Sequence, residues 1–164
     1  ETLEYGIESF VYRARRPFHP QKIYDFFANT FDHPSSEYFV EKNPVKKRCL
    51  LRSKGFFWLA SRPQFAGQWS QAGGVAQHGA AGMFWKAIPQ EHWPEDAEQR
   101  EFILNNWQEP FGDMRQELVF IGQHLDKNWM IRQLNNCLLD DDELERGQQY
   151  WKTLSDPFPA WLEE

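Results

Sequence analysis

Residues 51–62 read LRSKGFFWLASR, and they predict two short strands joined by a tight turn. The β-forming segments are Arg48–Ser53 and Phe56–Ser61, with Lys54-Gly55 between them. Glycine adopts the unusual backbone angles that a hairpin turn requires, so we expect a β-hairpin at this point. Because side chains alternate along a strand, Arg52 and Lys54 should share one face. If the turn preserves the alternation, the same row continues through Leu50, Phe56 and Trp58.

Four further segments have the pattern of strands. They are Tyr5–Arg16, Gln68–Ala76, Met83–Ile88 and Glu117–Gln123. The first and last alternate between two sets of apolar side chains, which is typical of strands in a packed sheet. Gly73-Gly74 suggests a bulge or a close backbone approach within its strand, and the small, polar run Gln77–Gly82 suggests a turn.

Helices are predicted between these strands. One begins at His19-Pro20, and another covers Asp96–Trp107, where Phe102, Ile103 and Trp107 should form the apolar face. Asp126 can cap a helix over Lys127–Cys137, and Asp140 with Glu143 has capping-box spacing for the last helix. Residues 32–47 are expected to form a loop. Strands and helices are segregated, without a repeating βαβ unit, which predicts an α+β fold with an antiparallel or mixed sheet and helices mainly on one face.

Composition limits the class of protein. The chain has 164 residues, of which 41% are hydrophobic and 26% charged, and this suits a single globular domain over residues 1–164. A net charge of -6 argues against a nucleic-acid partner, because phosphate binding usually needs a basic excess. No apolar stretch approaches the ~20 residues that cross a bilayer, so no membrane partner is expected. The chain starts with Glu1 rather than Met, and we expect it to be a piece of a longer protein.

The sequence lacks the common motifs of catalytic and cofactor sites. It contains neither a GxxxxGKS or GxxxxGKT phosphate loop nor a GxGxxG or GxSxG motif. The histidines are scattered, at His19, His33, His78, His92 and His124, and Cys49 and Cys137 are far apart. We therefore expect no catalytic, cofactor-binding or metal-ligating residue in this chain, and the cysteines suggest the reducing cytoplasm. The acidic run at residues 140–143 is explained as a helix start instead of a divalent-ion site.

Several segments together resemble a known family. They are residues 5–20 (YGIESFVYRARRPFHP), 51–62 (LRSKGFFWLASR), 69–74 (WSQAGG) and 112–122 (GDMRQELVFIG). In this order, over nearly the whole chain, they are similar to the C-terminal domain of CobW-type, nickel-chaperone-like, GTP-dependent metal chaperones. Met114 departs from the pattern, because members with this long form often carry arginine there, and we assign that position no charged role.

The resemblance implies a function that the residues alone do not. It implies a parent protein whose N-terminal GTPase domain carries a Walker A loop and a Cys-x-Cys-Cys metal motif, and which uses GTP, Mg²⁺ and a transition metal such as zinc. It implies that this chain is the regulatory or client-docking domain, whose partners are that GTPase domain and a client metalloprotein. The isolated chain should then not hydrolyse GTP.

A docking role makes particular residues candidates. Arg52, Lys54, Gly55 and Trp58, together with Asp113, Arg115 and Glu117, are expected to form the surface that faces the GTPase domain or the client. The alternative is an internal salt bridge between Arg52 or Lys54 and Asp113 or Glu117. Two other functions remain open: an independent protein-interaction module, and a small enzyme built on Asp113, Arg115 and Glu117. The acidic balance argues against a third, a nucleic-acid module using Arg13, Arg15, Arg48, Arg52 and Lys54.

Overall fold

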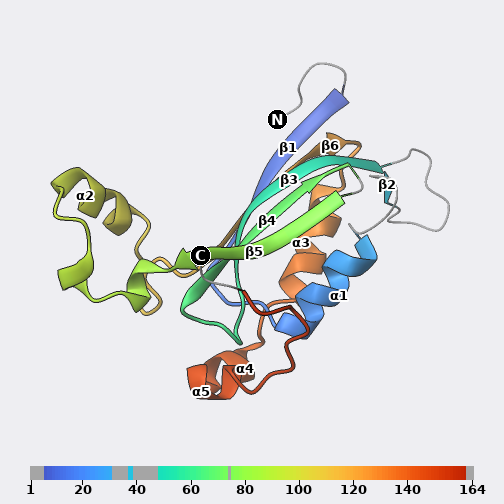
Figure 1. The fold of residues 1–164 in the computed structure, drawn as a ribbon. Coiled ribbons are helices and arrows are strands. Elements are labelled where there is room, and N and C mark those ends of the chain that lie inside the picture. Colours follow the sequence, from blue (N-terminus) through green and yellow to red (C-terminus); the bar gives the residue numbers. More distant parts are fainter. Residues whose placement is uncertain (1–5, 31–36, 39–47, 74, 162–164) are drawn as a thin grey trace.

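An antiparallel sheet forms the centre of the molecule (Figure 1). The computed structural model describes residues 6–30, 37–38, 48–73 and 75–161. The strands are β1 (Ile7–Ala14), β2 (Glu37–Tyr38), β3 (Arg48–Trp58), β4 (Phe65–Ala72), β5 (Val75–Met83) and β6 (Gln116–Gln123). Their order is β1-β6-β3-β4-β5, with the short β2 paired on β3. The first and last of the predicted strands, β1 and β6, are confirmed, and they pair with each other along eight residues. The predicted loop at residues 32–47 lies outside the described residues except for β2.

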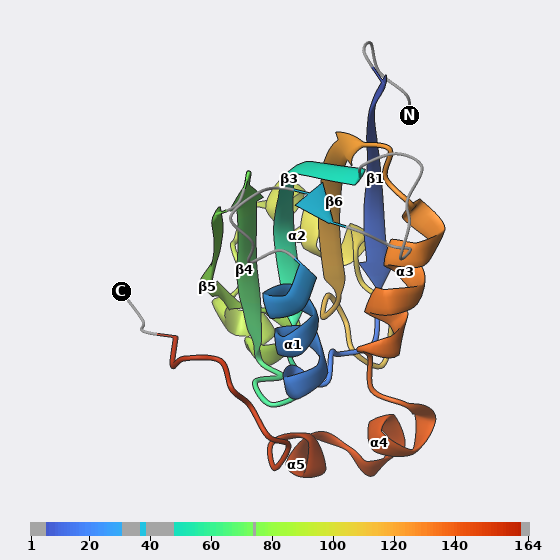
Figure 2. The same ribbon diagram turned by 90° about the vertical axis from the view of Figure 1, so that its right-hand side faces the viewer.

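Helices cover one face of this sheet. Helices α1 (Pro20–Thr30) and α3 (Lys127–Asn136) pack on it, while α2 (Ala97–Asn105) lies on the opposite side of the sheet and apart from it (Figure 1, Figure 2). Two short helices, α4 (Asp141–Arg146) and α5 (Gln148–Trp151), follow at one end of the sheet. The α+β class with helices mainly on one face is therefore confirmed.

The helix caps predicted at Asp126 and Asp140 are present, and Asp96, predicted only as the first residue of its helix, forms a third. The Asp96 carboxylate accepts a hydrogen bond from the backbone N–H of Gln99, and Asp126 accepts one from Trp129. Asp140 and Glu143 form a complete capping box, each side chain accepting from the other's backbone N–H, at 2.8 and 3.0 Å. These side chains satisfy N–H groups that a helix start otherwise leaves unpaired, so local sequence fixes three helix starts.

The hairpin predicted at Lys54-Gly55 is wrong. Strand β3 continues through both residues, and Lys54 pairs with Ser70 of β4 on one side and with Val119 of β6 on the other. Gly55 has a φ of 148°, and a Cβ at this position would overlap the backbone carbonyl of Glu117. Glycine is therefore required because two central strands approach closely, and no turn is involved.

A bulge in β3 changes which side chains share a face. The pairing with β6 shifts between Leu50, opposite Gly122, and Arg52, opposite Ile121, so that Leu51 is an extra residue. Leu50 is consequently buried on the helix-covered face, whereas Arg52 is exposed on the other. The expectation that Leu50 continues the row of Arg52 and Lys54 is wrong for this reason.

The predictions for the next segment are also corrected. Gly73, with a φ of 59°, lies in the connection between β4 and β5, not in a bulge within one strand. Strand β5 includes the whole of residues 77–82, which were predicted to form a turn, because they pair with β4. The strand predicted over Met83–Ile88 is instead the end of β5 followed by the 3₁₀ turn η2 (Trp85–Ala87).

The core consists of two clusters of large side chains. The first lies between the sheet and α1 and α3 and includes Phe27, Phe57 and Trp69. The second lies at one end of the sheet and consists of Trp58, Ala60, Phe84, Met114, Leu139 and Trp151. Met114 is 3% exposed there, so an apolar residue suits this position.

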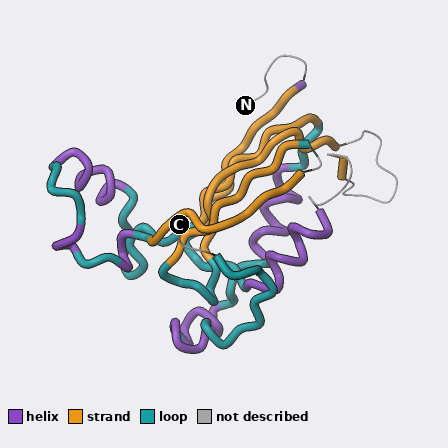
Figure 3. Tube along the Cα trace, viewed as in Figure 1, coloured by secondary structure: helices purple, strands orange, loops and turns teal. Residues whose placement is uncertain are grey.

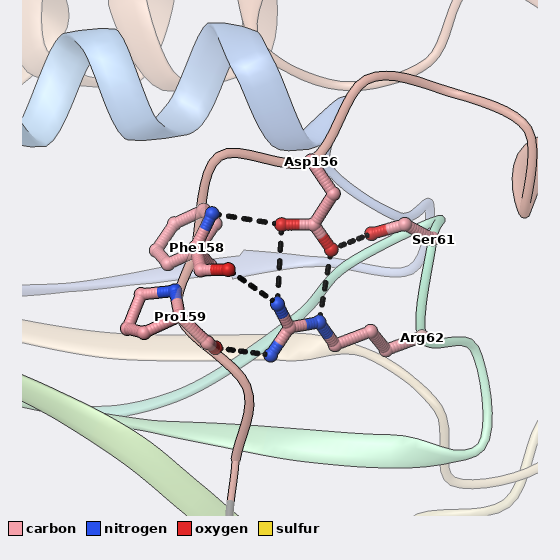
Figure 4. A network of polar contacts seen from close by, with 5 residues as sticks. All are labelled: Ser61, Arg62, Asp156, Phe158 and Pro159. Carbon is pink, nitrogen blue, oxygen red and sulfur yellow. Dashed lines mark hydrogen bonds and ion pairs between the residues drawn. The ribbon is translucent and has the colours of Figure 1, made fainter.

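Arg62 fixes the C-terminal segment to the sheet (Figure 4). Its Nε lies 2.9 Å from Oδ2 of Asp156, and its other nitrogens donate to the carbonyls of Phe158 and Pro159, both at 2.9 Å. The Ser61 hydroxyl also donates to Asp156, at 2.6 Å. Both charged side chains are 17% exposed, so this pair is better shielded from water than a surface ion pair.

Residues 84–113, here called the arm, connect β5 to β6 and extend away from the sheet as short helices and loops (Figure 3). The arm contains η2, the 3₁₀ turn η3 (Gln90–His92) and α2. Its own small core is aromatic, with the rings of Trp85 and Trp107 at 6.3 and 5.4 Å from that of Trp93. The arm extends from the uncovered side of the sheet, and we call the angle between these two surfaces the corner.

Candidate functional site

The sheet face opposite α1 and α3 is the candidate site, and we call it the open face. Register and alternation assign to it Ser9, Val11 and Arg13 of β1, Glu117, Val119 and Ile121 of β6, Arg52, Lys54 and Phe56 of β3, and Gln68, Ser70 and Ala72 of β4. These side chains are exposed or half-buried, while their neighbours along each strand point into the core.

A charged cluster occupies one end of the open face. The Nε of Arg13 lies 2.9 Å from Oε1 of Glu117, and Nη2 of Arg115 lies 4.0 Å from Oε2 of the same carboxylate. The guanidinium of Arg115 also lies over the ring of Phe56, 4.9 Å from its centroid. Burial lowers the pKa of Arg115, which is 13% exposed, although an arginine stays charged at neutral pH. Sequence reasoning missed Arg13 as the partner of Glu117, because 104 positions separate them.

Arg52 and Lys54 lie farther along the open face, and both are exposed. Their cross-strand neighbours are uncharged: Ile121 and Ala72 flank Arg52, and Val119 and Ser70 flank Lys54. Among the described residues, neither cation forms an ion pair, and Glu117 is paired with Arg13 and Arg115. The alternative was a salt bridge from Arg52 or Lys54 to Asp113 or Glu117, and the described residues do not form it.

Asp113 has a structural contact and does not lie on the open face. It is 6% exposed, and its two carboxylate oxygens accept hydrogen bonds from the backbone N–H groups of Trp85 and Lys86, both at 2.8 Å. This carboxylate thereby caps the start of η2 and holds the base of the arm. With both oxygens occupied, Asp113 does not form the catalytic group with Arg115 and Glu117 that the sequence left open.

Trp58 and Gly55 support the surface from within. Trp58 is fully buried in the second core cluster, where its Nε1 donates to the Pro63 carbonyl at 2.9 Å. Gly55 permits the close approach of β3 to β6. Of the seven residues predicted for the surface, Arg52, Lys54, Arg115 and Glu117 are the ones whose side chains lie on or beside the open face.

A pocket of about 230 Å³ lies in the corner between the open face and the arm. The sheet contributes Phe56 and Met83 to its lining, α2 contributes Phe102 and Ile103, and Arg115 lines it just before β6 begins. Phe102 was predicted to share the buried face of α2, but it is 71% exposed, and only Ile103 is buried. Adjacent helical residues point about 100° apart, and in α2 only Ile103 of this pair faces inward. The sequence carries no signal for which of the two side chains is exposed.

The described residues do not provide a side-chain cluster for the metal that the resemblance implies for the parent. No three His, Cys, Asp or Glu side chains in the described ranges lie together as a metal site would require. His78, for example, packs against the ring of Phe158 at 5.2 Å, where burial and the charge of Arg62 lower its pKa. The part of the chain that the structure describes also has no helix long and apolar enough to cross a membrane.

Comparison with known proteins gives one consistent family. The profile described as "Cobalamin synthesis protein cobW C-terminal domain" matches residues 7–138. The zinc-regulated GTPase metalloprotein activator 1 of Dictyostelium discoideum is 40% identical over 161 residues, covering 96% of this chain and 30% of that protein. The zinc chaperone Rv0106 of Mycobacterium tuberculosis is 30% identical over 154 residues, covering 93% of this chain and 34% of that protein.

A solved structure agrees with the fold. The Zn(II)-bound YjiA GTPase from E. coli superposes with a TM-score of 0.52 at 13% identity, over 82% of this chain and 30% of that one. At this identity the likeness concerns the fold alone. The chain spans about a third of the length of the relatives that it matches. On the profile match and the sequence identity together, the chain belongs to the CobW C-terminal domain family.

Proposed function

We propose that this chain is the regulatory and client-docking domain of a GTP-dependent zinc chaperone, and that the open face is its docking surface. The parent's N-terminal GTPase domain supplies the GTP, Mg²⁺ and metal sites, and residues 1–164 form a single non-catalytic domain beside it. The partners of the surface are that GTPase domain and a client metalloprotein, in the cytoplasm. The names of two relatives, a zinc-regulated GTPase metalloprotein activator and a zinc chaperone, support the choice of metal.

The observation that carries the proposal is the position of Arg52 and Lys54. The chain has a net charge of -6, yet these two cations are held side by side on an uncovered sheet face without an acidic neighbour across the strands. Placing like charges close together weakens a fold slightly, and no structural contact among the described residues requires either of them. A complementary surface of another protein would remove this repulsion and use both charges.

The apolar side chains of the open face support the same proposal. Val11 is 37% exposed, and Val119, Ile121 and Phe56 are half-buried. An antiparallel sheet that faces water on one side usually alternates apolar residues in the core with polar residues outside. Here the outer side chains include a central apolar band between the cations, which is the composition of a protein interface.

The test is the double variant R52A/K54A in the full-length parent, with GTP turnover in the presence of client and the melting temperature both measured. Docking predicts an unchanged melting temperature with altered turnover or client binding, because the variant removes surface charges only. The matched control is K22A/R132A, which removes one lysine and one arginine from the exposed sides of α1 and α3. This control should change neither quantity.

The proposal fails if R52A/K54A lowers the melting temperature clearly while turnover and client binding stay normal. The same conclusion follows if K22A/R132A alters turnover as much as R52A/K54A does, because the effect would then depend on net charge and not on the open face.

A further inference from the structure

The corner pocket specifies the chemistry of the docked partner. We propose that it receives one large apolar side chain from an acidic segment of a partner protein, with the flanking carboxylates paired to the cations of the open face. This inference rests on the proposed function, since it assigns a ligand to the same surface.

The apolar part of the argument comes from the lining of the pocket. Two of the exposed large apolar side chains in the described residues, Phe102 at 71% and Met83 at 42%, both line it. They come from different elements, α2 and β5, and the half-buried ring of Phe56 also lines the pocket. Exposed apolar side chains that converge on one hollow commonly mark a binding site, whereas single ones scattered over a surface do not. About 230 Å³ suits one side chain and is too small for a cofactor.

The acidic part of the argument comes from the charges around the pocket. Arg115 lines it, and its guanidinium donates to the Asp113 carbonyl at 2.7 Å and lies 4.0 Å from Oε2 of Glu117. A guanidinium has five N–H donors, so these two contacts leave donors for a further carboxylate, which their forked arrangement matches. Arg52 and Lys54 continue the positive charge along β3. Together the open face and the pocket carry four cations, Arg13, Arg52, Lys54 and Arg115, against the carboxylates of Glu117 and the buried Asp113, so this region is positive in a chain that is negative overall.

The arm disfavours nucleic acid as the occupant. Residues 84–113 contain seven acidic side chains and two basic ones, so the wall beside the open face repels a continuous polyanion. A short protein segment differs because it can place its acidic side chains on the sheet and its apolar side chain toward α2.

The test uses fluorescence anisotropy of a labelled peptide, acetyl-Glu-Asp-Phe-Asp-Glu-amide, titrated with the 164-residue chain. We expect saturable binding that weakens at about 0.5 M salt, because salt screens the charges. Replacing Phe by Ser in the peptide, or its acidic residues by Lys, should each weaken binding at least about tenfold. The first change removes a buried aromatic side chain, and the second removes the ion pairs with the cations of the open face. The protein variant F102S should have a similar effect. Its matched control is L104S, on the same helix and 52% exposed but outside the pocket, and it should bind normally.

The inference is overturned if the peptide does not saturate, or if F102S and L104S weaken its binding equally. Tighter binding of a fifteen-residue oligothymidine that competes with the peptide would assign the face to nucleic acid instead. Concentration-dependent dimerisation that F102S abolishes would assign it to a second copy. A different result would contradict the proposed function alone: the chain binds the peptide, but R52A/K54A has no effect in the full-length parent. An effect of R52A/K54A without peptide binding would overturn this inference alone.

Discussion

The indole nitrogen of Trp69 donates a hydrogen bond of 2.7 Å to the hydroxyl of Ser53, on the strand beside it. Ser53 in turn donates to Oε1 of Gln71 at 3.0 Å, and all three side chains are 1–2% exposed. The substitution S53A removes a partner from two buried polar groups. We expect a loss of about 1–3 kcal/mol in the free energy of unfolding, measured by urea denaturation. The control S70A, on the open face, should stay within about 0.5 kcal/mol of the wild type.

Gly55 should tolerate no side chain. In G55A the new Cβ would overlap the Glu117 carbonyl, and β3 and β6 would have to separate. We expect a loss on the order of 3 kcal/mol or more, or no folded protein. The matched control is G79A on β5, where a Cβ meets nothing within 4 Å and the backbone angle is ordinary. Equal stability of G55A and G79A in the same denaturation experiment would show that the strands have room to separate.

Asp113 should hold the arm without affecting the sheet. In D113N the amide offers one acceptor where the carboxylate offers two, so Trp85 or Lys86 loses its hydrogen bond. We expect faster hydrogen exchange at these two backbone amides and a local loss of about 1–3 kcal/mol. The control E98Q changes an exposed carboxylate on α2 of the same arm and should leave both exchange rates alone. Unchanged exchange in D113N would contradict the capping role.

Stability should fall as the solution becomes acidic. Burial lowers the pKa of His78 and of His19 below the ordinary value of 6.5, so the unfolded chain binds protons more readily than the folded one. The stability that these two neutral histidines contribute is fully present above pH 6.5, and it is lost as the pH falls below that value. We expect the melting temperature to drop between about pH 7.5 and about pH 5.5, and H78Q to reduce that drop. If the melting temperature of H78Q falls as far as that of the wild type, other groups cause the fall. H92Q, which changes an exposed histidine, is the control.

Much of the fold was predictable because its signals are local. Asp126 and Asp140 cap their own helices, and the alternating side chains of residues 117–123 mark a buried strand. Gly55 was misinterpreted because glycine serves a turn and a close strand contact equally well, and only the pairing partner distinguishes them. Residues 77–82 were predicted as a turn because they are small, and their strand conformation depends on pairing with β4.

The candidate site was predictable to a smaller extent. The shared face of Arg52 and Lys54 follows from alternation alone, and it is confirmed. The burial of Asp113 was not predictable, because it depends on the arm returning to the sheet so that residues 85 and 86 meet it. The corner pocket likewise needs Phe56 and Phe102 to approach each other from elements far apart in the sequence.

The position of β6 has a consequence for how the protein is made. This strand lies between β1 and β3, yet it is the last strand to leave the ribosome. Within the described sheet, β1 pairs only with β6, so the N-terminal strand must wait until about residue 123 has been synthesised. Pairings between segments so far apart in sequence form slowly, and the apolar side of β1 stays exposed in the meantime. The arm, with its own tryptophan core, is complete before β6 appears, so the periphery of the molecule can fold before its centre.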